Sequence, residues 1–299
     1  MVTLVGRANT GKSSLLNALL GEKVSVVSPV AQTTRRPVRG ILTQDGYQIV
    51  FLDTPGIRRA THSLSSMLNR TARGLVTGAD AVLLLLDASV APYDEDLGWM
   101  KKLAGEIEPI FAVLNKTDLG LRRAAYESAW TEILQTIRAR NPDFTPPPLR
   151  WFETSAATGD GLPELLAALR DALPEAPPLF PPDMLTDDPR PFFIADVIRA
   201  QINQRLTKEL PHAIAVAVDS IEDADTSVQV AATIYVEKNS QRPIVIGQRA
   251  KMIRDIRHAA QKDLAAIFDK PHKLELWVKV EPNWSRNYWL LKKFGYVQG

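Results

Sequence analysis

A glycine-rich octet near the N-terminus has the composition of a phosphate-binding loop. It fits the pattern GxxxxGKS and lies between the apolar run 2–5 and the helix-like run 14–20. Glycine lets the backbone wrap closely around a phosphate chain, and the N–H groups at a helix start attract anions. The octet predicts a nucleoside triphosphate site, in which a lysine reaches the outer phosphates and a serine hydroxyl binds Mg2+. Its residues are Gly6, Arg7, Ala8, Asn9, Thr10, Gly11, Lys12 and Ser13.

A second polar group, after the apolar run 110–114, would select the base. The carboxylate of Asp118 can accept hydrogen bonds from N1–H and N2–H of guanine, whereas adenine would leave it unpaired. We expect Asn115 to tie this loop to the phosphate loop and Lys116 to cover the face of the base. Further along, the backbone at Ser155 and Ala156 would contact the guanine oxygen. Taken alone, the tetrapeptide 115–118 is more typical of a surface turn, and only its order among the other motifs favours a base-binding loop.

The residues between these motifs would sense the outermost phosphate. The strand-like run 47–52 ends at Asp53, which we expect to hold the metal through water, and the N–H of Gly56 would contact the γ-phosphate. Upstream, Thr34 is favoured over Thr33 as the threonine that closes over Mg2+. Four motifs in this order, each next to an expected strand, predict a GTP-binding domain.

These motifs resemble those of one family. The segments GRANTGKS at 6–13, AQTTR at 31–35, DTPG at 53–56, NKTD at 115–118 and SA at 155–156 look like the five G-motifs of Era-type bacterial ribosome-assembly GTPases, within the Ras-like class. The resemblance continues beyond them, through 180–189, 193–199 and 209–212, and so covers nearly the whole chain.

The resemblance implies a monomeric switch protein that hydrolyses GTP slowly to GDP and phosphate. It would bind single-stranded ribosomal RNA near the 3′ end of the small-subunit RNA and assist assembly of the 30S subunit. Lys12, Thr34, Gly56 and Asn9 would take part in catalysis, and Ser13, Thr34 and Asp53 would hold Mg2+. Relatives of this type use an asparagine at the position of Asn9 to bind K+, which would offset developing charge; a side chain that only stabilises the loop is the alternative.

Two positions near the switch bear on the rate of hydrolysis. Ile57 follows Gly56 where Ras-like hydrolases usually carry a water-orienting glutamine, so slow intrinsic turnover is expected. His62 lies just beyond and is interpreted as an exposed loop residue rather than a general base.

Composition places these motifs in a two-domain chain with a basic end. The chain has 299 residues and no cysteine, which excludes disulfides and cysteine-ligated zinc and agrees with a reducing cytoplasm. It has no run of about 18 apolar residues and no cleavable signal pattern, so no segment is expected to span or cross a membrane. Residues 238–299 hold 13 Lys/Arg against 5 Asp/Glu, a net of +8, while the rest holds 23 against 29, a net of −6. This asymmetry predicts an anionic partner for the C-terminal part.

The expected elements divide the chain into an α/β P-loop domain and a smaller α+β domain. In residues 1–172, strands alternate with amphipathic helices such as 162–173, which predicts a mostly parallel sheet with helices on both faces. Residues 173–191 are rich in proline and are interpreted as a stiff linker. Residues 192–299 form the second predicted domain.

The second domain resembles a type II KH domain, which clamps single-stranded RNA with a GxxG loop. Its expected order is helix 192–210, strands 213–221 and 227–237, a short turn, helix 252–268 and strand 274–280. Ala250 stands where the loop has its second glycine and would add a methyl group beside the RNA backbone. The predicted RNA-binding residues are Ile246, Gly247, Gln248, Arg249, Ala250, Lys251, Arg254 and Arg257.

Two points stay open in the sequence. Trp284, Tyr288 and Trp289 near the C-terminus would either stack on bases or pack the last helix onto the domain, and packing is favoured. The alternative output for the basic domain is peripheral association with anionic lipid at the inner face of the cell membrane. A lipid-binding segment would show one broad apolar face with cationic flanks, whereas the GxxG-like turn favours RNA.

Overall fold

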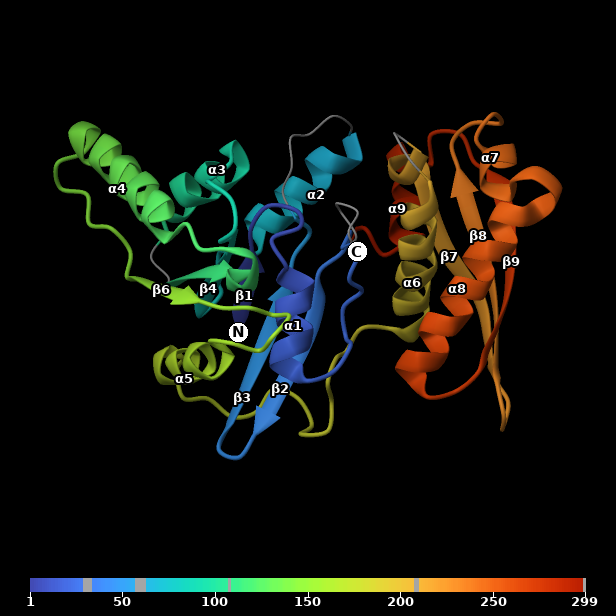
Figure 1. The fold of residues 1–299 in the computed structure, drawn as a ribbon, viewed down its shortest axis with the longest axis horizontal. Coiled ribbons are helices and arrows are strands. Elements are labelled where there is room, and N and C mark those ends of the chain that lie inside the picture. The colour runs from blue at the N-terminus through green and yellow to red at the C-terminus, as the bar shows by residue number, and fades with distance from the viewer. Residues whose placement is uncertain (29–33, 57–62, 107–108, 207–209, 298–299) are drawn as a thin grey trace. The chain divides into compact units, whose positions relative to one another are not determined.

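The chain forms two compact units (Figure 1). The computed structural model describes residues 1–28, 34–56, 63–106, 109–206 and 210–297, without the side chains of Ser63, Ser65 and His212. Unit 1 comprises Met1–Ser25 and Pro37–Asp187, and unit 2 comprises Val26–Arg36 and Asp188–Gly299. Thr33, Ile57 and His62 lie outside the described residues, as do residues 31–32 of the AQTTR segment and residues 207–209 at the end of the predicted helix 192–210.

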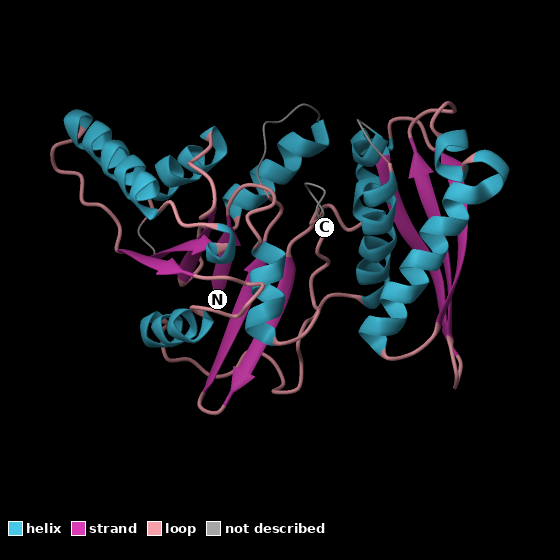
Figure 2. Ribbon diagram, viewed as in Figure 1, coloured by secondary structure: helices cyan, strands magenta, loops and turns pink. Residues whose placement is uncertain are grey.

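Unit 1 is built on a mostly parallel sheet, which confirms the predicted fold class (Figure 2). Among the described residues its strands are arranged in the order β2-β3-β1-β4-β5-β6, and only the β2–β3 pair is antiparallel. The strands are β1 (Val2–Val5), β2 (Val38–Gln44), β3 (Tyr47–Asp53), β4 (Ala81–Asp87), β5 (Ile110–Asn115) and β6 (Leu149–Glu153).

Helices cover both faces of this sheet, and its central strands are therefore buried on both sides. Helices α1 (Lys12–Leu20) and α5 (Leu162–Ala172) pack with Leu4, Phe51 and Leu83 on one face. On the other face, α2 (Ser63–Gly74), α3 (Asp94–Leu103) and α4 (Arg123–Arg140) pack with Val82, Leu84 and Leu86. Neighbouring residues of β4 thus serve two separate cores.

The parallel strands bring the predicted motifs to one edge of the sheet. Strands β1, β3, β4 and β5 run in the same direction, and their carboxyl ends lead into the phosphate loop, Asp53, Asp87 and Asn115. Open α/β sheets bind ligands at this edge. Segments far apart in the sequence therefore meet in one place in unit 1.

Unit 2 has the predicted order of helices and strands. Its three-stranded sheet has the order β7-β8-β9, with β7 and β8 antiparallel and β8 and β9 parallel. One core joins α6 and α8 to the strands, through residues such as Ile198, Ile234 and Leu264. The elements are α6 (Arg190–Arg205), β7 (Ile214–Asp223), β8 (Val228–Val236), α7 (Arg242–Ile246), α8 (Lys251–Phe268), β9 (His272–Val280) and α9 (Tyr288–Lys293).

The C-terminal aromatic residues divide between packing and exposure. Trp284 is fully buried, donates a hydrogen bond from Nε1 to the carbonyl of Ala213 at 3.0 Å, and packs edge-on against Phe294. Packing, the favoured interpretation, therefore holds for this residue. Tyr288 and Trp289 are 49% and 74% exposed, so it does not hold for them.

Residues Val26–Arg36 group with unit 2, although they lie early in the sequence. The guanidinium of Arg35 is buried and donates hydrogen bonds to the carbonyls of Ile214 at 2.7 Å and Pro211 at 2.9 Å. Arg36 makes a two-pronged ion pair with Asp188. The segment is thus held by residues more than 150 positions away in the sequence, whereas the proline-rich residues 173–187 group with unit 1.

Candidate functional site

The phosphate loop connects β1 to α1 with a backbone that only small residues allow. Gly6 and Gly11 have φ of 147° and 97°. A Cβ on Gly6 would lie 2.4 Å from the carbonyl oxygen of Leu85, and one on Gly11 would lie 2.3 Å from Nδ2 of Asn115. The glycines are therefore needed for both conformation and close approach.

Lys12 lies inside the curve of this loop. Its ammonium donates hydrogen bonds to the carbonyls of Arg7 at 2.8 Å and Gly6 at 3.3 Å. Burial lowers the pKa of Lys12 to about 8, while the charge of Asp53 acts in the opposite direction. Gly56 also lies against the loop, since a Cβ there would be 3.1 Å from Nζ of Lys12. An anion in the curve would meet this ammonium directly.

Two hydroxyl groups converge on the carboxylate of Asp53. Ser13 Oγ donates to Oδ2 at 2.7 Å, and Ser25 Oγ donates to the same oxygen at 2.9 Å. Asn17 holds the backbone at Ser25, because its side chain accepts from the Ser25 N–H at 2.9 Å and donates to the Ser25 carbonyl at 2.8 Å. Hydroxyl and carboxylate oxygens are ligands that Mg2+ prefers, so Ser13 and Asp53 fit this metal. Thr34, the third predicted ligand, belongs by its contacts to unit 2.

Asn115 joins the phosphate loop to both loops predicted to hold guanine. Its side chain is buried, donates from Nδ2 to the carbonyl of Thr10 at 2.9 Å, and accepts from the N–H of Ala156 at 3.0 Å. Ser155 Oγ donates to Oδ1 of Asp118 at 2.6 Å, which holds this carboxylate beside the SA segment. The predicted base-binding residues therefore form one connected group.

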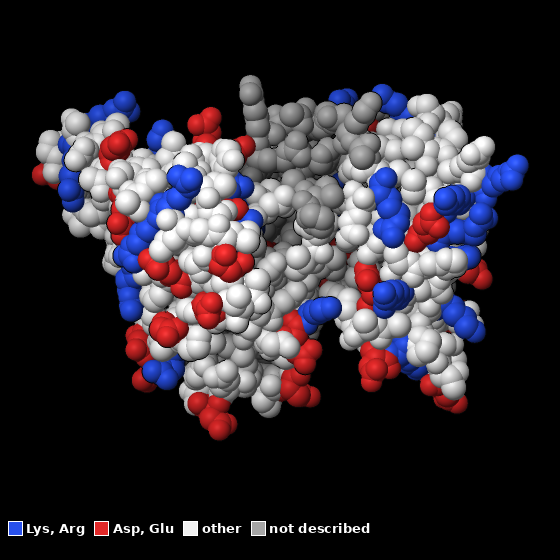
Figure 3. Space-filling view, in the orientation of Figure 1, with Lys and Arg blue, Asp and Glu red and all other residues white. Residues whose placement is uncertain are grey.

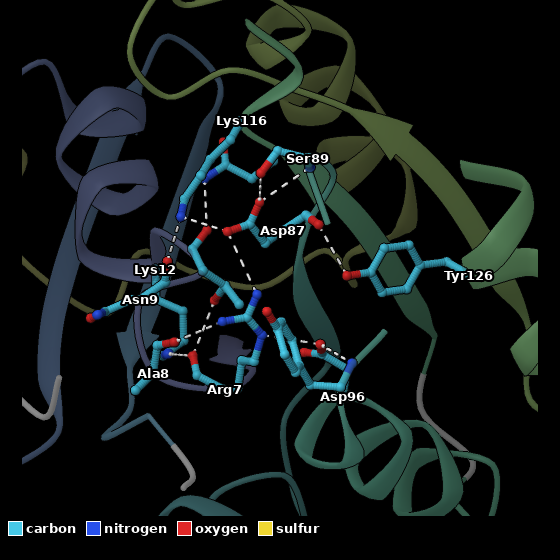
Figure 4. A network of polar contacts seen from close by, with 12 residues as sticks. Arg7, Ala8, Asn9, Lys12, Asp87, Ser89, Asp96, Lys116 and Tyr126 are labelled. Atoms are coloured by element: carbon cyan, nitrogen blue, oxygen red, sulfur yellow. Dashed lines mark hydrogen bonds and ion pairs between the residues drawn. The ribbon is translucent and has the colours of Figure 1, made fainter. Parts of the chain in front are cut away.

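Lys116 takes part in a polar network beside the phosphate loop (Figure 4). Its ammonium donates to Oδ2 of Asp87 at 2.7 Å and to the carbonyl of Asn9 at 2.7 Å. Burial would raise the pKa of Asp87, but hydrogen bonds from Lys116 and Ser89 outweigh it and lower this pKa. Asn9 has φ of 65° and is exposed, and Figure 4 shows its side chain pointing away from Asp87.

Sequence reasoning missed three residues at this site. Ser25, Asp87 and Asp96 match no motif considered, and serine and aspartate are common on surfaces. Their sequence signals are weak: Asp87 ends the apolar run of β4, and Asp96 lies in the first turn of α3. Only burial, at 4%, 6% and 0% exposure respectively, distinguishes them from ordinary polar residues.

The GxxG-like turn lies between α7 and α8 in unit 2. Gly247 has φ of 73°, and a Cβ there would lie 2.7 Å from the backbone nitrogen of Met252. Arg249 and Ala250 both adopt the left-handed conformation, with φ of 50° and 59°. A conformation that glycine adopts freely costs about 1 kcal/mol for other residues. Ala250, at the position of the second glycine, therefore carries a backbone strain that its residue type does not reveal.

The predicted RNA-binding side chains lie on and beside this turn. Gln248, Arg249, Lys251 and Arg254 are exposed, while Ile246 and Arg257 are partly buried. Figure 3 shows Lys and Arg side chains over α7 and α8, with acidic side chains among them. The cations are thus available to the phosphates of a nucleic acid strand.

Known proteins match the chain along almost its whole length. Residues 1–116 match a family described as 50S ribosome-binding GTPase, and residues 209–285 match the KH domain family. GTPase Era of Geobacter metallireducens is 38% identical over 298 residues, which are 99% of this chain and 97% of that protein. GTPase Era of Rippkaea orientalis is 36% identical over 297 residues, 99% of this chain and 91% of that protein.

Two crystal structures agree in fold. A variant of Aquifex aeolicus Era bound to GDP and AlF4− is 33% identical, with a TM-score of 0.82, and the match covers 99% of this chain and 98% of that one. A structure of Era in complex with MgGDPNP and nucleotides 1506–1542 of 16S ribosomal RNA is also 33% identical, with a TM-score of 0.83 and the same coverage. With both domains matched in sequence and structure, the chain belongs to the Era family of GTPases.

Proposed function

We propose that this protein binds and hydrolyses GTP and, through unit 2, binds single-stranded RNA near the 3′ end of the small-subunit ribosomal RNA. Its role would be to assist assembly of the 30S subunit, as a monomer in the cytoplasm. The relative solved with 16S ribosomal RNA supports this partner. The family matched by residues 1–116 is described by 50S ribosome binding, whereas the relative that matches 99% of this chain was solved with 16S ribosomal RNA, and we give the latter more weight.

The observation that carries the GTPase proposal is the side chain of Asn115. This side chain hydrogen-bonds to Thr10 in the phosphate loop and to Ala156 in the SA segment, so it connects the phosphate site to the base site directly. Asp118, held by Ser155, presents a carboxylate to N1–H and N2–H of guanine. A purine without these donors would leave the carboxylate unpaired, which disfavours adenine.

Each side chain has a distinct task in this proposal. Lys12 would leave the loop carbonyls and neutralise the outer phosphates, and Gly56, near Ala8 and Lys12, would offer its N–H to the γ-phosphate. Ser13 and Asp53 would hold Mg2+, which when bound neutralises charge on the β- and γ-phosphates. Thr34 stays the proposed third ligand.

Potassium dependence and slow turnover form a further part of the proposal. Asn9 stands exposed on the phosphate loop in a left-handed conformation, with an amide oxygen suited to a monovalent cation. Hydrolysis should therefore be faster in a K+ buffer than in a matched Na+ buffer. Equal rates in the two buffers would refute the proposed role of K+. A turnover near 1 s−1 without any partner would contradict slow intrinsic hydrolysis.

The GTPase proposal is tested by nucleotide selectivity. Titration of the full chain with GDP and ADP in Mg2+ should give at least about 10^3-fold tighter binding of GDP. Asp118→Asn should remove most of this preference, because its amide would place a donor opposite the N1–H and N2–H of guanine. Asn141→Asp, which lies just after α4, is a control expected to leave both affinities unchanged. Equal binding of GDP and ADP by the unaltered chain would overturn the proposal.

The RNA proposal is tested with charge reversal in the full chain. A fragment beginning at residue 192 would lack Arg35 and Arg36, whose partners lie in unit 2, so the whole chain is the proper material. Arg249→Glu with Lys251→Glu should weaken binding of single-stranded 16S 3′-end RNA and flatten its salt dependence. Arg138→Glu with Arg140→Glu, a matched reversal on α4 in unit 1, should change neither. Unchanged affinity in the first double variant would refute this RNA interface.

No observation favours the alternative of membrane association. Ile256, Ala260 and Leu264 of α8 are buried in the core of unit 2, and the partly buried Met252, Ile267 and Phe268 of the same helix pack against that core. Among the described residues, no helix has both the length and the apolar character to cross a bilayer. Binding of the full chain to anionic vesicles, in the Mg2+ buffer used for the GDP and ADP titrations, would restore that alternative.

A further inference from the structure

The side chain of Arg7 turns away from the phosphate site, although Arg7 belongs to the phosphate loop. Its Nε donates to Oδ2 of Asp96 at 3.0 Å, and its Nη2 lies 3.6 Å from Oδ2 of Asp87. The guanidinium also lies 4.7 Å from the ring centre of Tyr93. Figure 4 shows the side chain of Arg7 between Asp87 and Asp96. The charge of Arg7 is thus directed into unit 1 and not toward a bound anion.

Asp96 is a costly residue to keep at this place. It is fully buried at the start of α3, where its carboxylate also accepts the N–H of Tyr93 at 3.0 Å. Burial raises the pKa of Asp96, while the Tyr93 hydrogen bond and the charge of Arg7 lower it. A helix start is stabilised by this cap without any need for a buried arginine. Capping of α3 therefore does not explain why Asp96 is paired with Arg7.

Asp87 extends the contact from the phosphate loop to the guanine loop. One of its oxygens, Oδ2, is approached by both Arg7 and Lys116, and Lys116 bonds the carbonyl of Asn9 as well. Asp87 is in turn fixed by Ser89, which donates to Oδ1 at 2.6 Å. Two cations from two loops therefore share one carboxylate at the end of β4.

We propose that Arg7 is a positioning residue for nucleotide binding: its side chain, clamped by Asp96 and Asp87, holds the phosphate loop at the spacing from the guanine loop that a nucleoside diphosphate requires. The inference rests on the proposed function and deepens it. A ligand that spans both loops gains from a preset spacing, because it does not have to order the loops when it binds. A ligand that occupies mainly the base loop gains little.

The test compares GDP with GMP, which carries the base but lacks the β-phosphate. Arg7→Met keeps an unbranched apolar stem and removes the charged guanidinium. GDP affinity, measured by calorimetry, should fall about tenfold or more, which is the effect of one charge-assisted contact. GMP affinity, measured by competition with a fluorescent GDP analogue, should change less than about threefold. Arg170→Met, an exposed ion-paired arginine of α5, is the matched control and should change neither.

A second variant separates positioning from stability. Arg7→Met alone leaves Asp96 buried without its cation, which can prevent folding. Adding Asp96→Asn removes that charge and keeps an acceptor for the Tyr93 N–H, so the double variant should unfold at a urea concentration near that of the unaltered chain. Its GDP affinity should nevertheless stay about tenfold low. If GDP affinity recovers together with stability, Arg7 serves folding only and the proposal is wrong.

The remaining outcomes distinguish this inference from the proposed function. Equal GDP affinity in Arg7→Met and the unaltered chain would overturn the positioning role and leave the GTPase proposal intact. An equal loss for GMP and GDP would overturn it too, since it would show damage to the base site. If the unaltered chain and the Arg170→Met control both fail to bind GDP, the proposed function itself is wrong.

Discussion

Asn115→Ala would test whether the nucleotide site is one connected structure. The side chain is 1% exposed and satisfies two backbone groups, the carbonyl of Thr10 and the N–H of Ala156, at 2.9 and 3.0 Å. Alanine leaves both groups inside unit 1 without this partner. Each buried group that loses its hydrogen bond costs about 1–3 kcal/mol, so two of them give a loss of about 2–6 kcal/mol. That is a large part of the stability of an ordinary domain, at about 5–15 kcal/mol.

Two measurements are needed, because the substitution should affect both folding and binding. Urea unfolding without nucleotide should show the loss in the free energy of unfolding, and calorimetric titration should show GDP binding at least about tenfold weaker. Asn115→Asp is the informative comparison. It keeps an acceptor for the Ala156 N–H but faces the Thr10 carbonyl with a second oxygen, so its loss should be as large. Asn141→Ala, at an exposed position after α4, should change neither quantity.

The reasoning fails if Asn115→Ala stays within about 0.5 kcal/mol of the unaltered chain and binds GDP within about twofold. The loops would then be positioned by other contacts. It fails in part if stability falls and GDP affinity does not, because the bond between the loops would then serve folding alone.

Three further predictions follow from single positions. Gly56→Ala places a Cβ 2.7 Å from phosphate-loop backbone, and the resulting strain of about 1–3 kcal/mol should slow GTP hydrolysis roughly 5- to 150-fold in a phosphate-release assay. Trp284→Ala should lower the free energy of unfolding by about 3–5 kcal/mol in urea, because the side chain is fully buried. Burial lowers the pKa of His272 below its ordinary 6.5, so the folded chain binds this proton less readily than the unfolded chain. The contribution of the neutral imidazole to the free energy of unfolding is therefore complete above pH 6.5 and is lost as the pH falls through the folded-state pKa. The stability difference between the unaltered chain and His272→Gln, measured by urea unfolding, should therefore shift against the unaltered chain between pH 7.5 and pH 5.

Each of these three predictions has a control variant or a result that would contradict it. Gly98→Ala in α3 meets nothing within 4 Å and should leave hydrolysis unchanged. Trp289→Ala removes a side chain that is 74% exposed and should change stability by less than about 0.5 kcal/mol. If Trp284→Ala is equally mild, the C-terminal segment does not contribute to the core of unit 2. A stability difference at His272 that is independent of pH would contradict the depressed pKa.

The motifs could be predicted because their residues are consecutive and follow strands. Parallel strands end at one edge of a sheet, so Asp53 and Asn115 could be expected to meet the octet 6–13 without knowledge of side-chain positions. The order of elements in unit 2 was predictable for a similar reason, since alternation and helical periodicity are local signals.

Other features depend on contacts that no local pattern records. The partners of Arg35 and Arg36 lie 152–261 residues away, so nothing near these arginines in the sequence indicates that their side chains pack with unit 2. Asp87 and Asp96 are ordinary residue types, and only burial beside Arg7 gives them a role. At Ala250 the residue type suggests a helix start, but the turn imposes a left-handed backbone.

The grouping of Val26–Arg36 with unit 2 determines when, during translation, Arg35 and Arg36 can form their final contacts. Arg35 also donates a hydrogen bond to the hydroxyl of Tyr296, which is 261 residues later in the chain. At about 5–20 residues per second, a ribosome needs roughly 13–52 s to cover that distance. The other partners are made earlier, since Asp188 follows Arg36 by 152 residues and Ile214 follows Arg35 by 179. The two arginines therefore gain their partners in unit 2 in sequence during translation, and the set of Arg35 is complete only after residue 296 has been added.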